Sequence, residues 1–122
     1  MVVLAVPNKP NLKRYLMARY LIQRNHAGAG KKGLLEEGGT SRRAVIEQLT
    51  SSPGGSVESV YQAFGDTDIF VIVAMPDNAS VAAAALMGSA SGAVSIKTTV
   101  LLTPEEIDEA ARKTPSYRPP GE

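Results

Sequence analysis

A single histidine and two neighbouring carboxylates are the side chains in this sequence best suited to chemistry. His26 is the only histidine, so one chain cannot build a multi-histidine metal site. It lies in a predicted polar loop, where a histidine is usually solvated, although it could act as a general base or an axial haem ligand. Asp66 and Asp68 flank a predicted hairpin turn, where two carboxylates could share a proton or bind a cation. Aspartate is also an ordinary turn residue, because its side chain bonds to nearby backbone.

Isolated cations and a phenol complete the set of candidates. On a helix, Arg43 can pair with Glu47 four residues later, which leaves Arg42 near the apolar side, where it could form an intersubunit salt link or reach an anionic ligand. Tyr61 and Lys97 lie in predicted strands, and their polar tips could line a cleft. The candidate ligand-binding residues are therefore Tyr61, Asp66, Asp68, Arg42, Lys97 and His26.

The segment Gly28-Ala29-Gly30-Lys31-Lys32-Gly33 fits the glycine pattern of dinucleotide-binding loops. We predict a flexible loop and helix entry instead. The apolar run before the segment stops at Ile22, well short of Gly28, and the chain lacks the further parallel βαβ units of such a fold. No other segment resembles a cofactor loop, and the absence of cysteine excludes thiolate metal sites. We expect no cofactor and no metal.

Length and composition limit the classes of protein that remain. The chain has 122 residues, which fits one domain, and 43% of them are hydrophobic, which is typical of a globular protein. A formal net charge of +1 provides no electrostatic surface for nucleic acid or an anionic membrane. The apolar opening of six residues is too short for a signal peptide or a membrane span. We expect a soluble protein, and the lack of cysteine fits the cytoplasm.

Hydrophobic periodicity and turn residues predict the elements that must position these side chains. The order is strand, helix, strand, strand, helix, strand, which is that of the ferredoxin-like βαββαβ plait, followed by one short extra helix. Gly38-Gly39 predicts a kink or break in the first helix, Asp77 or Asn78 is placed to cap the second, and Thr103 to Glu106 form a capping-box pattern. The predicted ranges are strand 13–23, turn 25–30, helix 31–51, strands 56–64 and 68–75, helix 79–90, strand 94–102 and helix 104–113.

The strand at 68–75 is apolar on both sides. Ile69, Val71, Val73 and Met75 alternate with Phe70, Ile72 and Ala74. In this fold both main helices cover one face of a four-stranded antiparallel sheet, so the other side of this strand would form a larger exposed apolar patch than monomers usually carry. We therefore expect a homodimer or higher oligomer, with dimer-face candidates Ile69, Phe70, Val71, Ile72 and Val73.

Five segments of the sequence form a recognisable pattern: 32–43 (KGLLEEGGTSRR), 64–68 (FGDTD), 75–78 (MPDN), 91–94 (SGAV) and 101–106 (LLTPEE). Together they resemble the GYD domain family, a group of small proteins assigned to dimeric α/β-barrel folds. The similarity covers roughly Arg14 to Ala110. Thr67 stands where the family's namesake motif has tyrosine, so no role of that tyrosine is transferred. The resemblance implies a ferredoxin-like fold and a dimer, and it implies no particular activity.

These observations predict an amino-terminal arm at 1–12 that is flexible or docked on a partner, a GYD-type domain at 13–113 and a disordered tail at 114–122. The predicted function is that of a dimeric small-molecule-binding or assembly module without established catalysis. The alternative is a cofactor-independent enzyme, monooxygenase- or isomerase-like, with a cleft lined by Tyr61, Asp68, Lys97 and His26.

Overall fold

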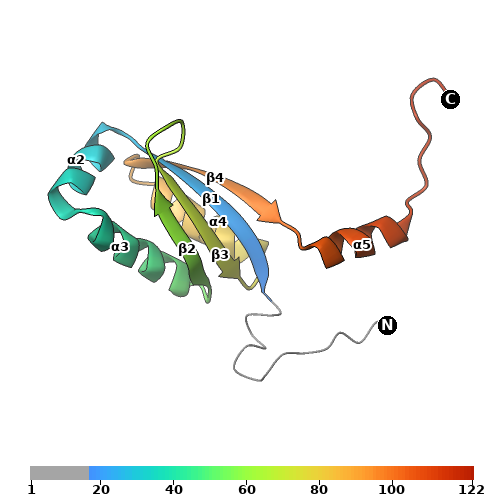
Figure 1. Ribbon diagram of the computed structural model, residues 1–122, viewed down its shortest axis with the longest axis horizontal. Coiled ribbons are helices and arrows are strands. Elements are labelled where there is room, and N and C mark those ends of the chain that lie inside the picture. Colours follow the sequence, from blue (N-terminus) through green and yellow to red (C-terminus); the bar gives the residue numbers. More distant parts are fainter. Residues whose placement is uncertain (1–16) are drawn as a thin grey trace.

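Four antiparallel strands form one sheet in the computed structural model, which describes residues 17–122 (Figure 1). The strand order is β2-β3-β1-β4, so the first and third strands in sequence lie at the centre. Each strand is antiparallel to its neighbours. This arrangement confirms the predicted ferredoxin-like α+β fold. The strands are β1 (Ala18–His26), β2 (Ser56–Gln62), β3 (Ile69–Met75) and β4 (Val94–Leu101).

Three helices, α2 (Gly28–Glu37), α3 (Gly39–Ser51) and α4 (Asn78–Ser89), lie to one side of the sheet (Figure 1). The predicted helix at 31–51 is two helices, α2 and α3. The predicted break falls at Gly38, whose φ of +84° lies in the region that favours glycine. The predicted cap of α4 is Asp77, whose carboxylate accepts a hydrogen bond from the backbone N–H of Ser80 at 2.8 Å.

The last helix, α5 (Pro104–Lys113), lies beyond the end of β4 and away from the sheet (Figure 1). The predicted capping box is present, because Thr103 and Glu106 exchange side-chain-to-backbone hydrogen bonds of 3.1 Å each. None of the residues of α5 is buried. The helix therefore depends on its own caps for stability and not on packing against the domain.

Strand β1 is longer at its carboxyl end than predicted. The predicted turn at 25–30 is wrong, because pairing with β4 continues as far as His26, opposite Val94. Asp68 holds this end: its backbone N–H donates to the Arg24 carbonyl at 3.1 Å, and its carboxylate accepts from the His26 N–H at 2.8 Å. The predicted start of this strand at 13–16 and the predicted arm at 1–12 lie outside the described residues.

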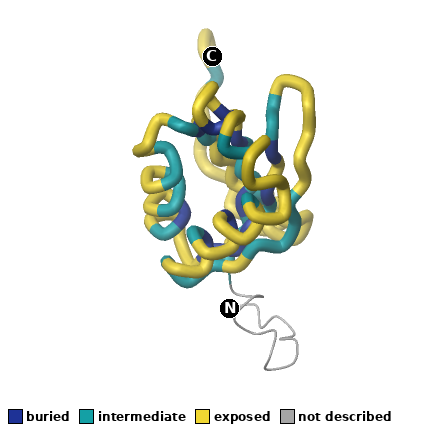
Figure 2. The backbone as a smooth tube through the Cα atoms, turned by 90° about the vertical axis from the view of Figure 1, so that its left-hand side faces the viewer, coloured by how far each residue is buried: buried dark blue, intermediate teal, exposed yellow. Residues whose placement is uncertain are grey.

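The core lies between the sheet and the helices, where Figure 2 shows the buried positions. Strand β3 divides as its alternation predicts, with every second residue buried against the helices and the others turned to the opposite face. Beyond α5, residues 114–122 form no helix or strand, and disorder there stays a prediction. The buried core cluster consists of Tyr20, Ile46, Ile69, Val71, Val73, Met75 and Val81.

Within residues 17–122, no helix covers the other face of the sheet, which we call the open face. Phe70 of β3 is 36% exposed and Tyr61 of β2 is 72% exposed, while Ile72 is half-buried. Ala74 is fully buried beside an ion pair between Arg19 of β1 and Glu58 of β2. The open face therefore combines an apolar centre with two opposite charges that compensate each other within one chain.

Candidate ligand cavity

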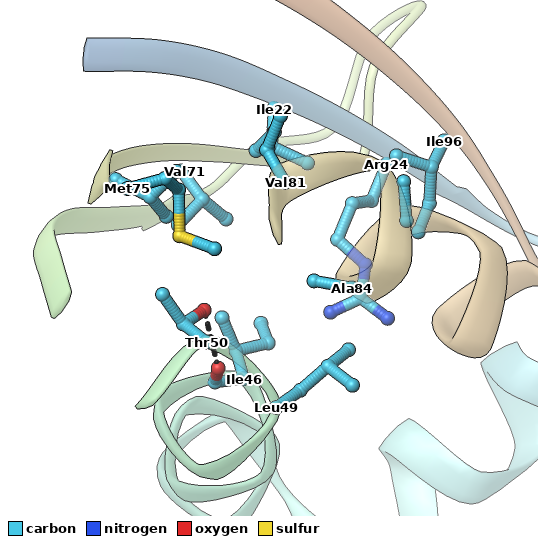
Figure 3. Close-up of a pocket in the computed structure, with 12 residues that line it drawn as sticks. Ile22, Arg24, Ile46, Leu49, Thr50, Val71, Met75, Val81, Ala84 and Ile96 are labelled. Carbon is cyan, nitrogen blue, oxygen red and sulfur yellow. Dashed lines mark hydrogen bonds between the residues drawn. The ribbon is translucent and has the colours of Figure 1, made fainter. Parts of the chain in front are cut away.

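A cavity of about 40 Å³ lies between the sheet and helices α3 and α4 (Figure 3). The sheet supplies one wall through β1, β3 and β4, and the two helices supply the other. The small side chains of Ala84 and Ala85 on α4 leave this space unfilled. The lining residues are Ile22, Arg24, Ile46, Leu49, Thr50, Val71, Val73, Met75, Val81, Ala84, Ala85 and Ile96.

Arg24 is the one charged residue among the lining residues. It follows Tyr20 and Ile22 in the alternation of β1, so its side chain leaves the sheet on the helix-covered face. Figure 3 shows its guanidinium reaching from β1 toward Ala84 and Leu49. The side chain is 5% exposed, and neither Nε nor Nη1 has a hydrogen-bond partner among the described residues. Residues 1–16 contain no Asp or Glu, so they supply no carboxylate for it.

Thr50 is the only other residue of the lining with a polar side chain. Its hydroxyl donates to the Ile46 carbonyl within α3 at 2.8 Å, as the dashed line in Figure 3 marks. This bond uses the hydroxyl proton inside the helix. Arg24 is therefore the only side chain of the lining with hydrogen-bond donors to spare.

Two further cationic or titratable groups lie near Arg24. His26 is 6% exposed, and neither ring nitrogen has a partner among the described residues; the same holds for Nε of Arg42 on α3. Burial lowers the pKa of Arg24, and the positive charge of Arg42 lowers it further. Burial also lowers the pKa of His26; Asp68 opposes this shift, whereas Arg42, Arg24 and Lys31 add to it. The region is therefore short of negative charge.

The structure does not gather the six predicted ligand-binding residues into one cleft. His26 and Arg42 lie near the cavity, and the Asp68 carboxylate accepts a hydrogen bond from the backbone N–H of His26. Tyr61 and Lys97 lie instead on the open face.

Tyr61 lies on the edge strand β2 and Lys97 on the opposite edge strand β4. Cross-strand pairing puts them at the two ends of one row of residues across the sheet, with Phe70 and Gln23 between them. Three strand spacings separate the pair, which is about 14 Å. Asp66 is exposed in the turn between β2 and β3. The cleft suggested for a cofactor-independent enzyme is therefore not assembled within one chain.

The five predicted dimer-face residues divide between the two faces of the sheet. Ile69, Val71 and Val73 are buried in the core against the helices. Phe70 and Ile72 lie on the open face. Only these two of the five are placed to contact a second chain.

Sequence reasoning missed Arg24, because the predicted strand ended at Gln23 and the polar residues after it resembled a loop. The signal that could have found it is the alternation itself, since Arg24 and His26 continue the series begun by Tyr20 and Ile22. A charged residue in phase with buried apolar ones is placed inside the protein.

The glycine motif at 28–33 directly follows β1 and forms the start of α2, so the predicted gap between strand and motif is wrong. The topology still differs from a dinucleotide-binding fold, because β1 has only antiparallel neighbours. Glycine is required at position 30 for packing, because a Cβ there would clash with the carbonyl oxygen of Ala93. The motif serves close approach of α2 to the segment before β4.

Comparisons with known proteins agree with this fold. Within residues 17–122, no helix is long and apolar enough to cross a bilayer. No curated protein matches the chain. Among solved structures, a crystal structure of MtbAldR matches with a TM-score of 0.53 and 17% sequence identity, a likeness that shows the fold alone. The match covers 84% of this chain but 59% of that chain, so this chain spans less than two thirds of MtbAldR.

A family model described as GYD domain matches residues 20–111, close to the range that carries the resemblance in the sequence. The match spans well over half of the chain. It begins within β1 and includes β2, β3, β4 and helices α2 to α4. The protein therefore belongs to the GYD domain family.

Proposed function

We propose that the protein binds a small molecule in the cavity between the sheet and helices α3 and α4. The observation that carries this proposal is the buried guanidinium of Arg24 in an apolar wall. Its Nε and Nη1 have no hydrogen-bond partner in the part of the chain that the structure describes. An unpaired buried charge destabilises a fold by several kcal/mol, on the order of 3 to 5 when a partner is missing. A bound molecule with an acceptor would recover part of that free energy, as pockets with few polar groups in apolar walls commonly do.

The volume limits the size of the molecule. A cavity of about 40 Å³ accommodates roughly three water molecules, at about 10 to 15 Å³ each on the same measure. A compact organic molecule with a few carbon atoms matches this space. Larger ligands would need the helices to move away from the sheet.

The cavity proposal is tested by filling the space from α4. Ala84→Leu extends a side chain from the cavity wall, whereas Ala82→Leu makes the same change at an exposed position of the same helix. We expect n-butanol and butyrate to cause saturable amide shifts at Val71 and Val81 in ¹⁵N-labelled wild type and in Ala82→Leu, and not in Ala84→Leu. Circular dichroism checks that both variants are folded. Absence of shifts in the wild type, or their persistence in Ala84→Leu, contradicts the proposal.

We also propose that the binding unit is a homodimer formed through the open face. The support is the apolar centre of that face around Phe70 and Ile72. No helix of residues 17–122 covers this centre. Its charges suit a second copy of the same surface, because Arg19 and Glu58 neutralise each other within one chain. In a two-fold interface the same surface patch of each chain meets its own copy, and an apolar patch without net charge can do so without repulsion.

Light scattering after size-exclusion chromatography tests the dimer. Wild type should elute with the mass of two chains, and Ile72→Asp should elute as a folded single chain, because the new carboxylate would be buried between two sheets. Tyr117→Asp is the matched control on an exposed residue outside the sheet. A monomeric wild type, or an Ile72→Asp variant of unchanged mass, contradicts the dimer.

A further inference from the structure

We infer that the ligand of the cavity is a small organic monocarboxylate, with its carboxylate on Arg24 and its apolar body along the wall formed by α3, α4 and the sheet. The inference rests on the proposed function and adds the chemical class of the ligand. It follows from three observations: the local charge, the distribution of donors, and the volume.

The charges around the cavity select an anion. Arg24 and Arg42 carry buried guanidinium nitrogens that have no partner among residues 17–122. Together with Lys31 they lie close enough to His26 to lower the pKa of its ring. The acid that opposes them is Asp68, and one of its carboxylate oxygens already accepts from the His26 backbone. A neutral or cationic ligand would leave this excess of positive charge in place, whereas a carboxylate would compensate it.

The distribution of donors favours one carboxylate over a polyanion. A guanidinium matches a planar carboxylate with parallel charge-assisted hydrogen bonds. The rest of the lining is apolar, apart from Thr50, whose hydroxyl proton is committed to the Ile46 carbonyl. The additional oxygens of a phosphate or a dicarboxylate would face apolar side chains without donors, which costs free energy.

The volume favours a short body. The space accommodates roughly three water molecules, which limits the ligand to a short-chain acid. Butyrate is therefore the probe for this class. Butyramide keeps its shape without the charge, and butylammonium reverses the charge.

The decisive experiment measures the affinity of these three probes for full-length wild type and for Arg24→Met by NMR titration at neutral pH. We expect wild type to bind butyrate at least tenfold more tightly than butyramide and to show no saturable shifts with butylammonium. Arg24→Met should bind butyramide as wild type does and should lose the tenfold preference for butyrate. Arg43→Met, which removes an exposed arginine paired with Glu47 on α3, should retain the preference.

A thermal melt gives a second readout that a merely structural arginine would not produce. Without ligand, Arg24→Met should melt at a higher temperature than wild type, because it replaces an unpaired buried charge by an apolar side chain of similar length. Saturating butyrate should raise the melting temperature of wild type and leave that of Arg24→Met unchanged. A ligand-free variant that melts well below wild type would show that Arg24 stabilises the fold and would overturn the inference.

The outcomes separate this inference from the proposed function. Equal affinity of wild type for butyrate and butyramide would overturn the carboxylate assignment while leaving small-molecule binding in place. Displacement of butyrate by inorganic phosphate at comparable concentration would overturn the preference for a monocarboxylate. If none of the probes binds, the proposed function fails with it.

Discussion

Two neighbouring substitutions in β3 test which side of the sheet is covered, and by what. Val71 is 1% exposed and faces the helices, whereas Ile72 is half-buried on the open face. Val71→Ala removes two methyl groups, which costs about 1.6 kcal/mol of transfer free energy at about 0.8 per group. The enlarged cavity adds roughly 1 kcal/mol. The free energy of unfolding should fall by about 2.5 kcal/mol, which lowers the melting temperature of a domain of this size by about 10 to 15 °C.

Ile72→Ala removes more atoms, yet in a single chain it should cost less, roughly 1 kcal/mol, because much of its surface is in water. The assay is urea and thermal unfolding of both variants at low and at high protein concentration. If the open face is covered by a second copy, the cost of Ile72→Ala should rise with protein concentration, while that of Val71→Ala should not. Equal costs in dilute solution would refute the assignment of the two faces, and a cost at Ile72 that never depends on concentration would argue against the dimer.

Three further predictions concern turns and caps. Gly55→Ala should destabilise the domain by about 2 kcal/mol or more in a urea melt, because a Cβ there would lie 2.8 Å from the Ala74 carbonyl oxygen, whereas Gly65→Ala has open space and should be silent. The hydrogen bonds in the first turn of α4 lower the pKa of Asp77. The stability that this cap gives the protein is therefore present above the pKa of Asp77 in the unfolded chain, and it is lost as the pH falls through the pKa of Asp77 in the folded protein. Asp77→Asn should therefore flatten the acid limb of the stability curve, and an unchanged limb would contradict this. Thr103→Ala should reduce helical circular dichroism without lowering the melting temperature of the sheet domain, because α5 has no buried residue; a matching fall in melting temperature would show that α5 docks.

The fold was predictable from local patterns that the tertiary structure reinforces. The unbroken apolar run of β3 predicts a central strand, and Gly38 marks the break between α2 and α3 because only glycine readily takes its backbone angle. The cap at Asp77 and the capping box at Thr103 follow from residue type and spacing. Each of these features depends on neighbours in the sequence, which is why the sequence reveals them.

The site was less predictable, because it depends on contacts between distant segments. Arg24 looks like a loop residue until β1 is extended by its pairing with β3 and β4. The cavity is lined by Ala84 and Ala85 of α4 and by Leu49 of α3, residues that no local pattern brings together. Tyr61 and Lys97 are sound candidates by residue type, but cross-strand register places them at opposite edges of the sheet.

The central position of β1 has a consequence for synthesis of the chain. Its partners, β3 and β4, follow it by some forty and seventy residues, so the hairpin of β2 and β3 can form before β1 has both neighbours. Until β4 has left the ribosome, β1 has a free edge that bears unsatisfied backbone groups and could pair with another chain. A product truncated before Val94 would keep that edge permanently, and we expect it to aggregate where the full chain folds.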